Sequence, residues 1–170
     1  ERDLFRQAER ASNPNQQSDA YANMRALRDH AGSFVSHFEL ELAKTLVQLD
    51  HAPEGKPGAT DGTAFQNLTL VQDTDIDRDI ILNELARRET AKRSTPLILL
   101  AQRFGVLAGS RAFELERVPL GPYALCRALR VAGDTLQLGL DAQLSLYHAF
   151  EQQVMASYGV GQVVASNSPK

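Results

Sequence analysis

The feature that most constrains the fold is a long apolar stripe between Ala20 and Leu49. Apolar side chains recur there every three or four residues, at Met24, Leu27, Ala31, Phe34, Val35, Phe38, Leu42, Leu46 and Leu49. This spacing is typical of one face of an α-helix, and parts of it match a coiled-coil seam. Such a helix would run about 45 Å, which is long for a small domain. We expect Ser18 or Asp19 to cap it and Gly32 to be its weak point.

The composition also favours helices. The 170 residues include 23 Leu and 22 Ala, but only 10 Val and 4 Ile. Unbranched side chains lose little rotamer freedom in a helix, whereas β-branched ones favour strands. We therefore predict an all-α protein, an irregular helical bundle of five to six helices with one long amphipathic helix. Residues 1–162 would form a single domain with a mobile, Pro- and Gly-rich loop at 51–67, followed by a disordered tail at 163–170.

The remaining helices are predicted from the same periodicity. They cover residues 1–12, Asp73–Arg93, Leu97–Ala108, a short segment after Gly121-Pro122 that Gly133 ends, and Leu140–Tyr158. The second of these would turn Ile76, Ile80, Leu85 and Ala86 inward, and the last would carry Leu140, Leu144, Tyr147, Phe150, Val154 and Tyr158 as its apolar stripe. Pro96 marks a break or a new start. Because Leu97–Ala108 is apolar on nearly every side, it should be central or covered by another chain.

Charge and cysteine content limit the classes of partner. The net charge is −3 and the isoelectric point is about 5.8, so no overall basic field for nucleic acid is expected. The longest apolar run, Pro96–Ala101, is far too short to cross a membrane. Cys126 is the only cysteine, and no export signal is visible. We expect a cytoplasmic protein without a cofactor.

One acidic segment resembles a calcium-binding loop. In Asp73–Glu84, the residues Asp73, Asp75, Asp77 and Glu84 occupy ligand positions of an EF-hand loop. Arg78, however, stands where that loop needs glycine for its sharp turn. We therefore favour an acidic helix start, which suits the helix dipole, and keep a metal site only as the alternative.

Two arginine pairs are candidate anion-binding groups. Arg6 and Arg10 match the Arg-x-x-x-Arg half of the cyclic-di-GMP signature of PilZ domains, but the other half is absent. Arg87 and Arg88 could contribute further positive charge. Solvent-exposed helix faces and a basic helix end explain the same residues. A sensor of a nucleotide second messenger such as cyclic-di-GMP is thus an alternative function.

Two segments carry a family resemblance. Leu100–Gly109 and, above all, Pro119–Gly133 resemble a proteobacterial family of unknown function (DUF1631-like), whose large members are often labelled thymidine phosphorylase. The matching residues are Pro119, Leu120, Gly121, Pro122, Leu125, Cys126, Leu144, Tyr147 and Phe150. Val118 departs from the pattern, which tends to a polar residue there. The resemblance implies one helical module of a longer protein and, through accompanying cyclic-di-GMP domains in some members, a regulatory role.

The residues themselves identify no chemistry. We find no glycine-rich phosphate loop, and no convergent nucleophile, base and oxyanion donor can be named, so we expect no enzymatic activity. A nucleoside-phosphorylase-type enzyme is the least favoured reading. The leading hypothesis is a self-associating, dimeric interaction module of a larger cytoplasmic regulatory protein, which another regulatory protein could also bind. Its candidate interface residues are Met24, Leu27, Phe34, Phe38, Leu42, Leu97, Leu100 and Phe104.

Overall fold

The computed structural model describes residues 2–47, 49 and 73–158, with the backbone alone for residues 73–76. Its elements are α1 (Arg2–Arg10), α2 (Pro14–Val47), α3 (Asp73–Lys92), α4 (Ser94–Leu107), the 3₁₀ turn η2 (Leu115–Arg117), α5 (Pro122–Asp134), α6 (Leu140–Phe150) and the π-helical segment η3 (Glu151–Met155). Within these ranges there is no strand, so the all-α prediction is confirmed. The predicted loop at 51–67 and the tail at 163–170 lie outside the described residues.

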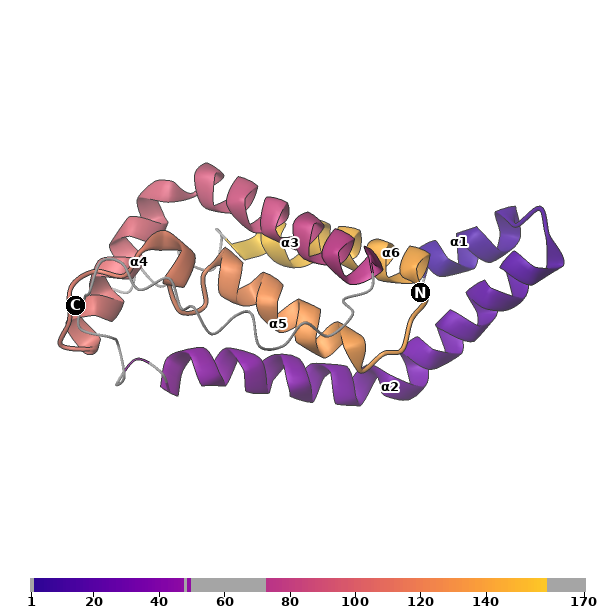
Figure 1. Ribbon diagram of the computed structural model, residues 1–170, viewed down its shortest axis with the longest axis horizontal. Coiled ribbons are helices and arrows are strands. Elements are labelled where there is room, and N and C mark those ends of the chain that lie inside the picture. The colour runs from indigo at the N-terminus through magenta and orange to yellow at the C-terminus, as the bar shows by residue number, and fades with distance from the viewer. Residues whose placement is uncertain (1, 48, 50–72, 159–170) are drawn as a thin grey trace.

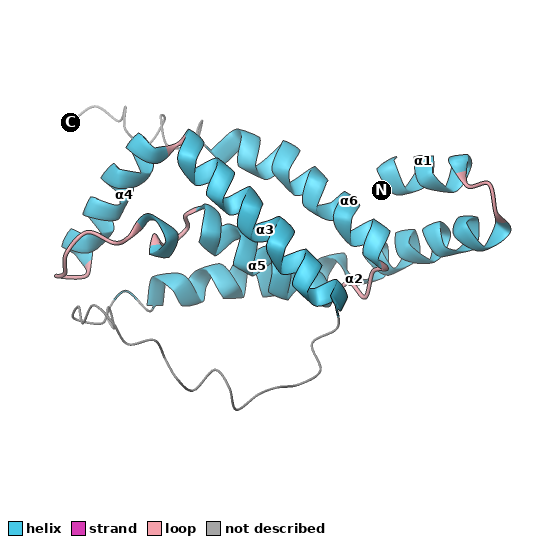
Figure 2. Ribbon diagram, turned by 45° about the horizontal axis from the view of Figure 1, so that its top comes forward, coloured by secondary structure: helices cyan, strands magenta, loops and turns pink. Residues whose placement is uncertain are grey.

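The helices form an elongated bundle in which α5 is central. Helix α2 runs along one side of the molecule, and α3 and α6 lie on the other side of α5 (Figure 1). Helix α1 folds back along the first part of α2, and this hairpin projects from one end of the molecule (Figure 2). Helix α4 lies at the opposite end, where it packs on α3 and η2.

The long helix begins earlier than its apolar stripe suggests. Helix α2 starts at Pro14, where the backbone carbonyl of Asn13 accepts a bond from Gln17 N (3.1 Å) and the Asn13 side chain accepts one from Asn15 N (3.0 Å). Proline suits the first helical position because its fixed φ is helical and its missing N–H is not needed there. The predicted cap at Ser18 or Asp19 is therefore wrong. The helix continues through Gly32 to Val47.

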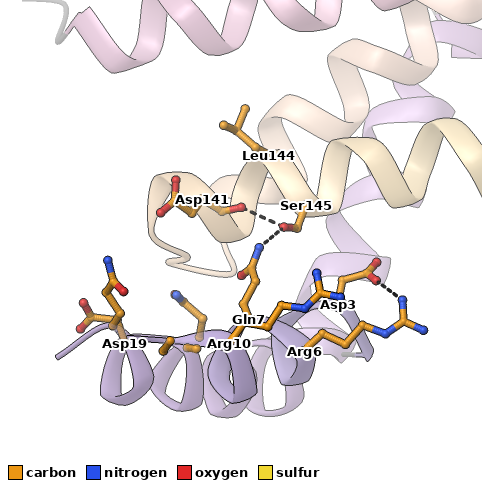
Figure 3. Close-up of a pocket in the computed structure, with 12 residues that line it drawn as sticks. Asp3, Arg6, Gln7, Arg10, Asp19, Asp141, Leu144 and Ser145 are labelled. Atoms are coloured by element: carbon orange, nitrogen blue, oxygen red, sulfur yellow. Dashed lines mark hydrogen bonds and ion pairs between the residues drawn. The ribbon is translucent and has the colours of Figure 1, made fainter. Parts of the chain in front are cut away.

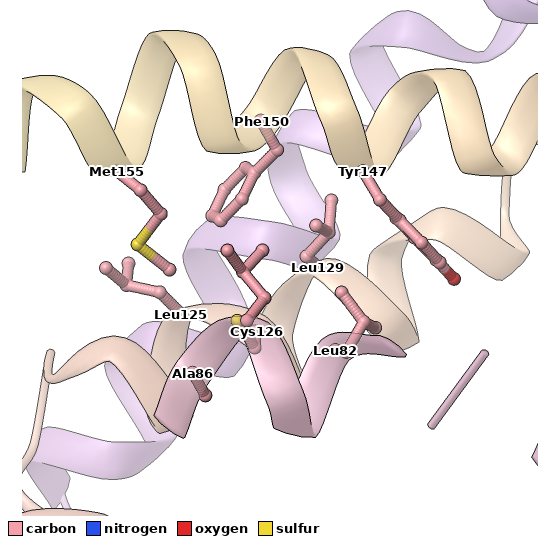
Figure 4. Close-up of a cluster of buried hydrophobic side chains, with 9 residues drawn as sticks. Leu82, Ala86, Leu125, Cys126, Leu129, Tyr147, Phe150 and Met155 are labelled. Atoms are coloured by element: carbon pink, nitrogen blue, oxygen red, sulfur yellow. The ribbon is translucent and has the colours of Figure 1, made fainter. Parts of the chain in front are cut away.

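Helix α5 forms the centre of the core. The sequence analysis predicted a central position for Leu97–Ala108 instead, unless another chain covers that helix. Most of its side chains are buried, because α2 and α3 pack against it and α6 covers a further side. The main apolar cluster consists of Leu82, Leu85, Ala86, Leu125, Cys126, Leu129, Tyr147, Phe150 and Met155 (Figure 4). A second cluster ties the α1–α2 hairpin to the body through Leu4, Leu136, Leu138 and Ala142.

The last helix spans the predicted range but changes its pitch. It is α-helical over Leu140–Phe150, π-helical over Glu151–Met155, and helical again to Tyr158. A π turn contains one residue more than an α turn. The buried face therefore passes from Phe150 to Met155, while the predicted Val154 is exposed. The predicted core residues Leu140 and Leu144 are exposed as well.

Helix α3 also presents a face that differs from the prediction. Its buried side chains include Leu82, Leu85, Ala86 and Glu89. Ile80, which was expected to point inward, is 59% exposed. The core-facing stripe is thus formed by Leu82, Leu85, Ala86 and Glu89, and Ile80 lies about 200° around the helix from Leu82, on the opposite side.

The segment that carries the family resemblance forms a tight turn before α5. Leu120 adopts a left-handed conformation (φ 59°), and Gly121 N donates to the Val118 carbonyl over 2.9 Å. A Cβ atom on Gly121 would lie 2.9 Å from that carbonyl oxygen, so glycine is required there. The Tyr158 hydroxyl donates to the Leu120 carbonyl (2.9 Å) and ties the turn to the end of the last helix. Pro122 then begins α5.

Candidate interaction surface

Helix α4 presents an apolar face to solvent. We call it the outer face of α4, and its residues are Ile98, Leu99, Gln102, Arg103, Val106 and Leu107. Val106 is 81% exposed, Leu107 is 74% exposed and Leu99 is 52% exposed. Arg103 is the only charged residue among them. Contiguous exposed apolar side chains of this kind mark interaction sites more often than isolated ones do.

The opposite face of α4 explains why the outer face stays uncovered. Leu97, Ala101 and Gly105 are buried, and the segment that follows the helix packs against Ala101 and Gly105. Phe113 N donates to the Ala101 carbonyl (3.3 Å), and a Cβ atom on Gly105 would lie only 2.7 Å from the Arg111 carbonyl oxygen. The chain can cover only one side of a peripheral helix in this way. The sequence is nevertheless apolar on the other side.

The apolar end of the molecule includes the last turn of α2. Val47 is 70% exposed and Leu46 is 38% exposed. In both views the C-terminal end of α2 lies at the same end of the molecule as α4 (Figures 1 and 2). The exposed apolar side chains at this end therefore come from two helices.

The predicted interface residues on α2 serve the fold itself. Met24, Leu27, Phe34, Phe38 and Leu42 are half-buried and pack against the two apolar clusters. Phe38 stacks on Phe34 (6.1 Å between ring centroids) and meets the edge of Phe150 (6.0 Å). A partner could reach only the remaining edges of these side chains.

The predicted interface residues on α4 lie on its less exposed side. Leu97 is fully buried, and Leu100 and Phe104 are half-buried. The four large apolar residues that the prediction left out are Ile98, Leu99, Val106 and Leu107. The sequence does show that α4 is apolar on nearly every side. Which of its sides faces solvent, however, depends on where the following segment packs.

A polar groove lies between the α1–α2 hairpin and the start of α6 (Figure 3). Its volume is about 680 Å³. Arg6 and Arg10 line it together with three carboxylates, Asp3, Asp19 and Asp141. Arg6 pairs with Asp3 at 3.6 Å. The carboxylates outnumber the guanidinium groups, so the groove is a poor match for a ligand with several negative charges.

Gln7 closes one part of this groove. Its side-chain amide donates to Ser145 Oγ (2.9 Å), and Ser145 Oγ donates to the Asp141 carbonyl (3.0 Å). These bonds hold α1 against α6. They also occupy polar groups that would otherwise be available to a ligand.

The second arginine pair lies elsewhere. Arg87 and Arg88 are on the second half of α3, away from α1 (Figure 1). Arg87 makes two bonds to the Glu84 carboxylate (2.7 and 2.9 Å), and Arg88 pairs with Glu151. The hydrogen bond from Arg87 lowers the pKa of Glu84. The structure therefore does not bring the four arginines together.

The acidic segment forms a helix. Asp73–Glu84 belongs to the continuous helix α3, whereas an EF-hand site is built on a turn with ligands converging on its centre. Asp77 is exposed, and Glu84 is engaged by Arg87. The side chains of Asp73 and Asp75 lie outside the described residues. No group of three or more His, Cys, Asp or Glu side chains that could hold a metal ion occurs within the described part of the chain.

The single thiol is a core residue. Cys126 is 3% exposed, and burial, with a further effect from the Glu89 charge, raises its pKa to about 12. The thiolate is the reactive form of cysteine. Cys126 is therefore held in its unreactive, protonated state at neutral pH.

Comparison with known proteins adds a family. The family model described as "Protein of unknown function (DUF1631) N-terminal domain" matches residues 1–163. Neither the curated proteins nor the solved structures yield a match to this chain. Among the described residues, no helix combines the length and apolarity needed to cross a membrane.

Proposed function

For this chain, which belongs to the DUF1631 N-terminal domain family, we propose the role of a non-catalytic, self-associating interaction module in a larger cytoplasmic regulatory protein. The observation that carries the proposal is the outer face of α4, where Val106 and Leu107 are more than 70% exposed on an almost uncharged helix. The burial of large apolar side chains lowers the free energy, by about 25 cal/mol per Å² of apolar surface removed from water. A second copy of the chain offers the same apolar face as a cover.

The size of the apolar end sets the expected strength of association. A stable interface takes about 800 Å² from each partner. The outer face of α4 is a single helix wide, so it supplies only part of such an area. Val47 and Leu46 at the end of α2 extend the apolar surface. We therefore expect a dimer that dissociates on dilution in the micromolar range.

Light scattering over a dilution series tests the proposal. The wild-type chain should move from twice its mass of 18.7 kDa toward the monomer mass as it is diluted. Val106→Glu should stay monomeric at every concentration, because dimerisation would bury an unpaired charge. Circular dichroism should show equal helix content for both, since residue 106 is 81% exposed.

The matched control is Val35→Glu. Val35 is also an exposed valine on a helix, but it lies on α2 at 50% exposure. This variant should dimerise like the wild type. A wild-type chain that is monomeric at the highest concentration, or equal loss of association in both variants, would refute the role assigned to α4.

Ligand binding in the α1–α2–α6 groove is the weaker proposal. It is favoured by one observation, that Arg6 and Arg10 line the same groove. It is disfavoured by the three aspartates there, one of which pairs with Arg6. Calorimetry with cyclic-di-GMP tests it: binding heat in the micromolar range that Arg10→Ala removes would support the sensor function, and its absence for the wild-type chain would end that proposal.

A further inference from the structure

The groove between the α1–α2 hairpin and α6 contains charged side chains besides the Arg6–Asp3 pair. They are Arg10, Asp19 and Asp141. Within the described part of the chain, none of these three side chains forms an ion pair or a hydrogen bond. The groove therefore offers one positive and two negative groups to a ligand, and its volume of about 680 Å³ is that of a small-molecule site.

These groups are arranged along the groove. Figure 3 shows the two unpaired carboxylates, one from α2 and one from α6, on one side of Gln7 and the Arg6–Asp3 pair on the other. Gln7 Nε2 donates to Ser145 Oγ (2.9 Å), but Gln7 Oε1 accepts no hydrogen bond from the described residues. An amide oxygen without a donor is thus available between the two ends.

We propose that this groove binds a basic α-amino acid, and that arginine fits it better than lysine. The ligand carboxylate pairs with the Arg10 guanidinium, and its α-ammonium group donates to Gln7 Oε1. Its side-chain cation lies between the carboxylates of Asp19 and Asp141. A guanidinium is planar and carries five N–H donors, so it can bond two carboxylates at once, whereas an ammonium group is a compact point charge.

Charge selects this class of ligand over others. The groove is lined by three aspartates and two arginines, so its charged side chains sum to −1. A basic amino acid carries two positive groups and one negative group at pH 7, so each unpaired side chain finds an opposite charge. A phosphate ligand would meet the aspartates, a neutral amino acid would leave them unpaired, and a polyamine would leave Arg10 unpaired.

The walls of the groove are held in place before a ligand arrives. Leu4 and Ala8 fix α1 by burial, and the Gln7–Ser145 bond ties it to α6. On the other wall, Gly139 N donates to Asn23 Oδ1 (3.0 Å) and ties the start of α6 to α2. A site whose walls are already ordered loses less conformational freedom when it binds a ligand.

The inference goes beyond the proposed function and does not depend on it. The α1–α2 hairpin projects from one end of the molecule, and α4 lies at the opposite end (Figure 2). The monomeric variant Val106→Glu should therefore bind arginine like the wild type. A failure of self-association and a failure of the amino-acid site are thus measured separately.

Calorimetry with free amino acids and two analogues tests the assignment. L-arginine should bind the wild-type chain one to one, with a dissociation constant below about 1 mM. Citrulline has a neutral urea group in place of the guanidinium, and agmatine lacks the carboxylate. Each should bind about tenfold more weakly than arginine, because each loses one charge-assisted contact.

Two variants connect the ligand groups to their residues. Arg10→Gln should weaken arginine about tenfold but leave agmatine unchanged, because agmatine has no carboxylate. Asp19→Asn should weaken both ligands equally, because both carry the guanidinium. The matched controls Arg25→Gln and Asp29→Asn change exposed residues of α2 outside the groove and should bind arginine like the wild type. Circular dichroism checks that every variant keeps its helix content.

Four outcomes would overturn the inference. The first is the absence of binding heat with arginine, and the second is equal affinity for arginine and citrulline. The third is equal weakening of arginine and agmatine by Arg10→Gln, because Arg10 would then not hold the carboxylate. The fourth is binding of cyclic-di-GMP without binding of arginine, which would assign the groove to the nucleotide instead.

Discussion

The Arg93 guanidinium donates a hydrogen bond to the backbone carbonyl of Met155 over 2.6 Å. Arg93 is the single residue between α3 and α4, and Met155 ends the π-helical segment η3. The same guanidinium pairs with the buried Glu89 carboxylate, which also accepts a bond from Lys92 (2.8 Å). One side chain therefore fastens the α3–α4 corner to the end of the last helix and sets the direction in which α4 leaves the body.

Replacement of Arg93 by methionine should destabilise the fold strongly. The Glu89 side chain is only 4% exposed, so the loss of Arg93 leaves a nearly buried carboxylate that pairs only with the more exposed Lys92 among the described residues. Breaking such a pair costs about 3 kcal/mol. Lys92→Met removes the second, 56% exposed partner of the same carboxylate and should cost less than about 1 kcal/mol. Urea unfolding followed by circular dichroism measures the unfolding free energy of both variants. Equal losses would show that Arg93 contributes no more to stability than Lys92 does.

Stability should fall in acid partly through Glu89. Burial raises the pKa of Glu89, but the hydrogen bonds from Lys92 and Arg93 outweigh it and hold the pKa below the ordinary value of 4.5. A carboxyl whose pKa is lower in the folded state stabilises the fold above its unfolded pKa and loses this contribution as the pH falls through the folded pKa. Between pH 7 and pH 3, the urea midpoint of Glu89→Gln should therefore decline less than that of the wild type. If the two urea midpoints declined equally with pH, Glu89 would not contribute to the loss of stability in acid.

Phe38 should behave as a core residue. It contacts Phe34 and Phe150, and it packs on the main apolar cluster. Phe38→Ala should lower the free energy of unfolding by about 2 kcal/mol, less than for a fully buried phenylalanine because one side of the ring is exposed. Val35→Ala, one turn away on the exposed face, should change it by less than about 0.5 kcal/mol. Loss of dimer with unchanged unfolding free energy would instead place Phe38 in the interface.

Two glycine-to-alanine changes should act in opposite directions. Gly32 lies inside α2 with no atom within 4 Å of a Cβ position, so Gly32→Ala should stabilise the helix by about 0.5–1 kcal/mol. At Gly105 the new Cβ would meet the Arg111 carbonyl oxygen at 2.7 Å, and the backbone around residue 111 would have to move. Gly105→Ala should destabilise by about 1–3 kcal/mol. Thermal or urea unfolding distinguishes the two signs, and a stabilising Gly105→Ala would show that the segment after α4 packs loosely.

The sequence predicts helix positions well where the signal is local. The stripe from Met24 to Leu46 runs along α2, Pro96 lies in the first turn of α4, and Pro122 begins α5. Proline and apolar spacing act through neighbouring residues, so their effect does not depend on the rest of the fold. The early start of α2 was missed because polar residues follow Pro14 and carry no apolar period.

The sequence predicts less well which side of a helix is covered. Val154 and Met155 are both large and apolar, and only the π turn decides that Met155 is buried. On α4, Leu97 and Leu99 are equally apolar, yet one is fully buried and the other is half exposed. In both cases the choice depends on where another segment lies, and apolarity alone does not specify that.

The helical class, the breaks between helices and the presence of one helix with apolar residues on every side can all be derived from the amino-acid sequence. These follow from backbone hydrogen bonds and side-chain contacts within a few residues of each other. The central position of α5, the position of α4 at one end of the molecule and the separation of the two arginine pairs are visible only in the folded protein. Those outcomes depend on contacts between residues distant in the chain, such as Arg93 with Met155, which local periodicity does not encode.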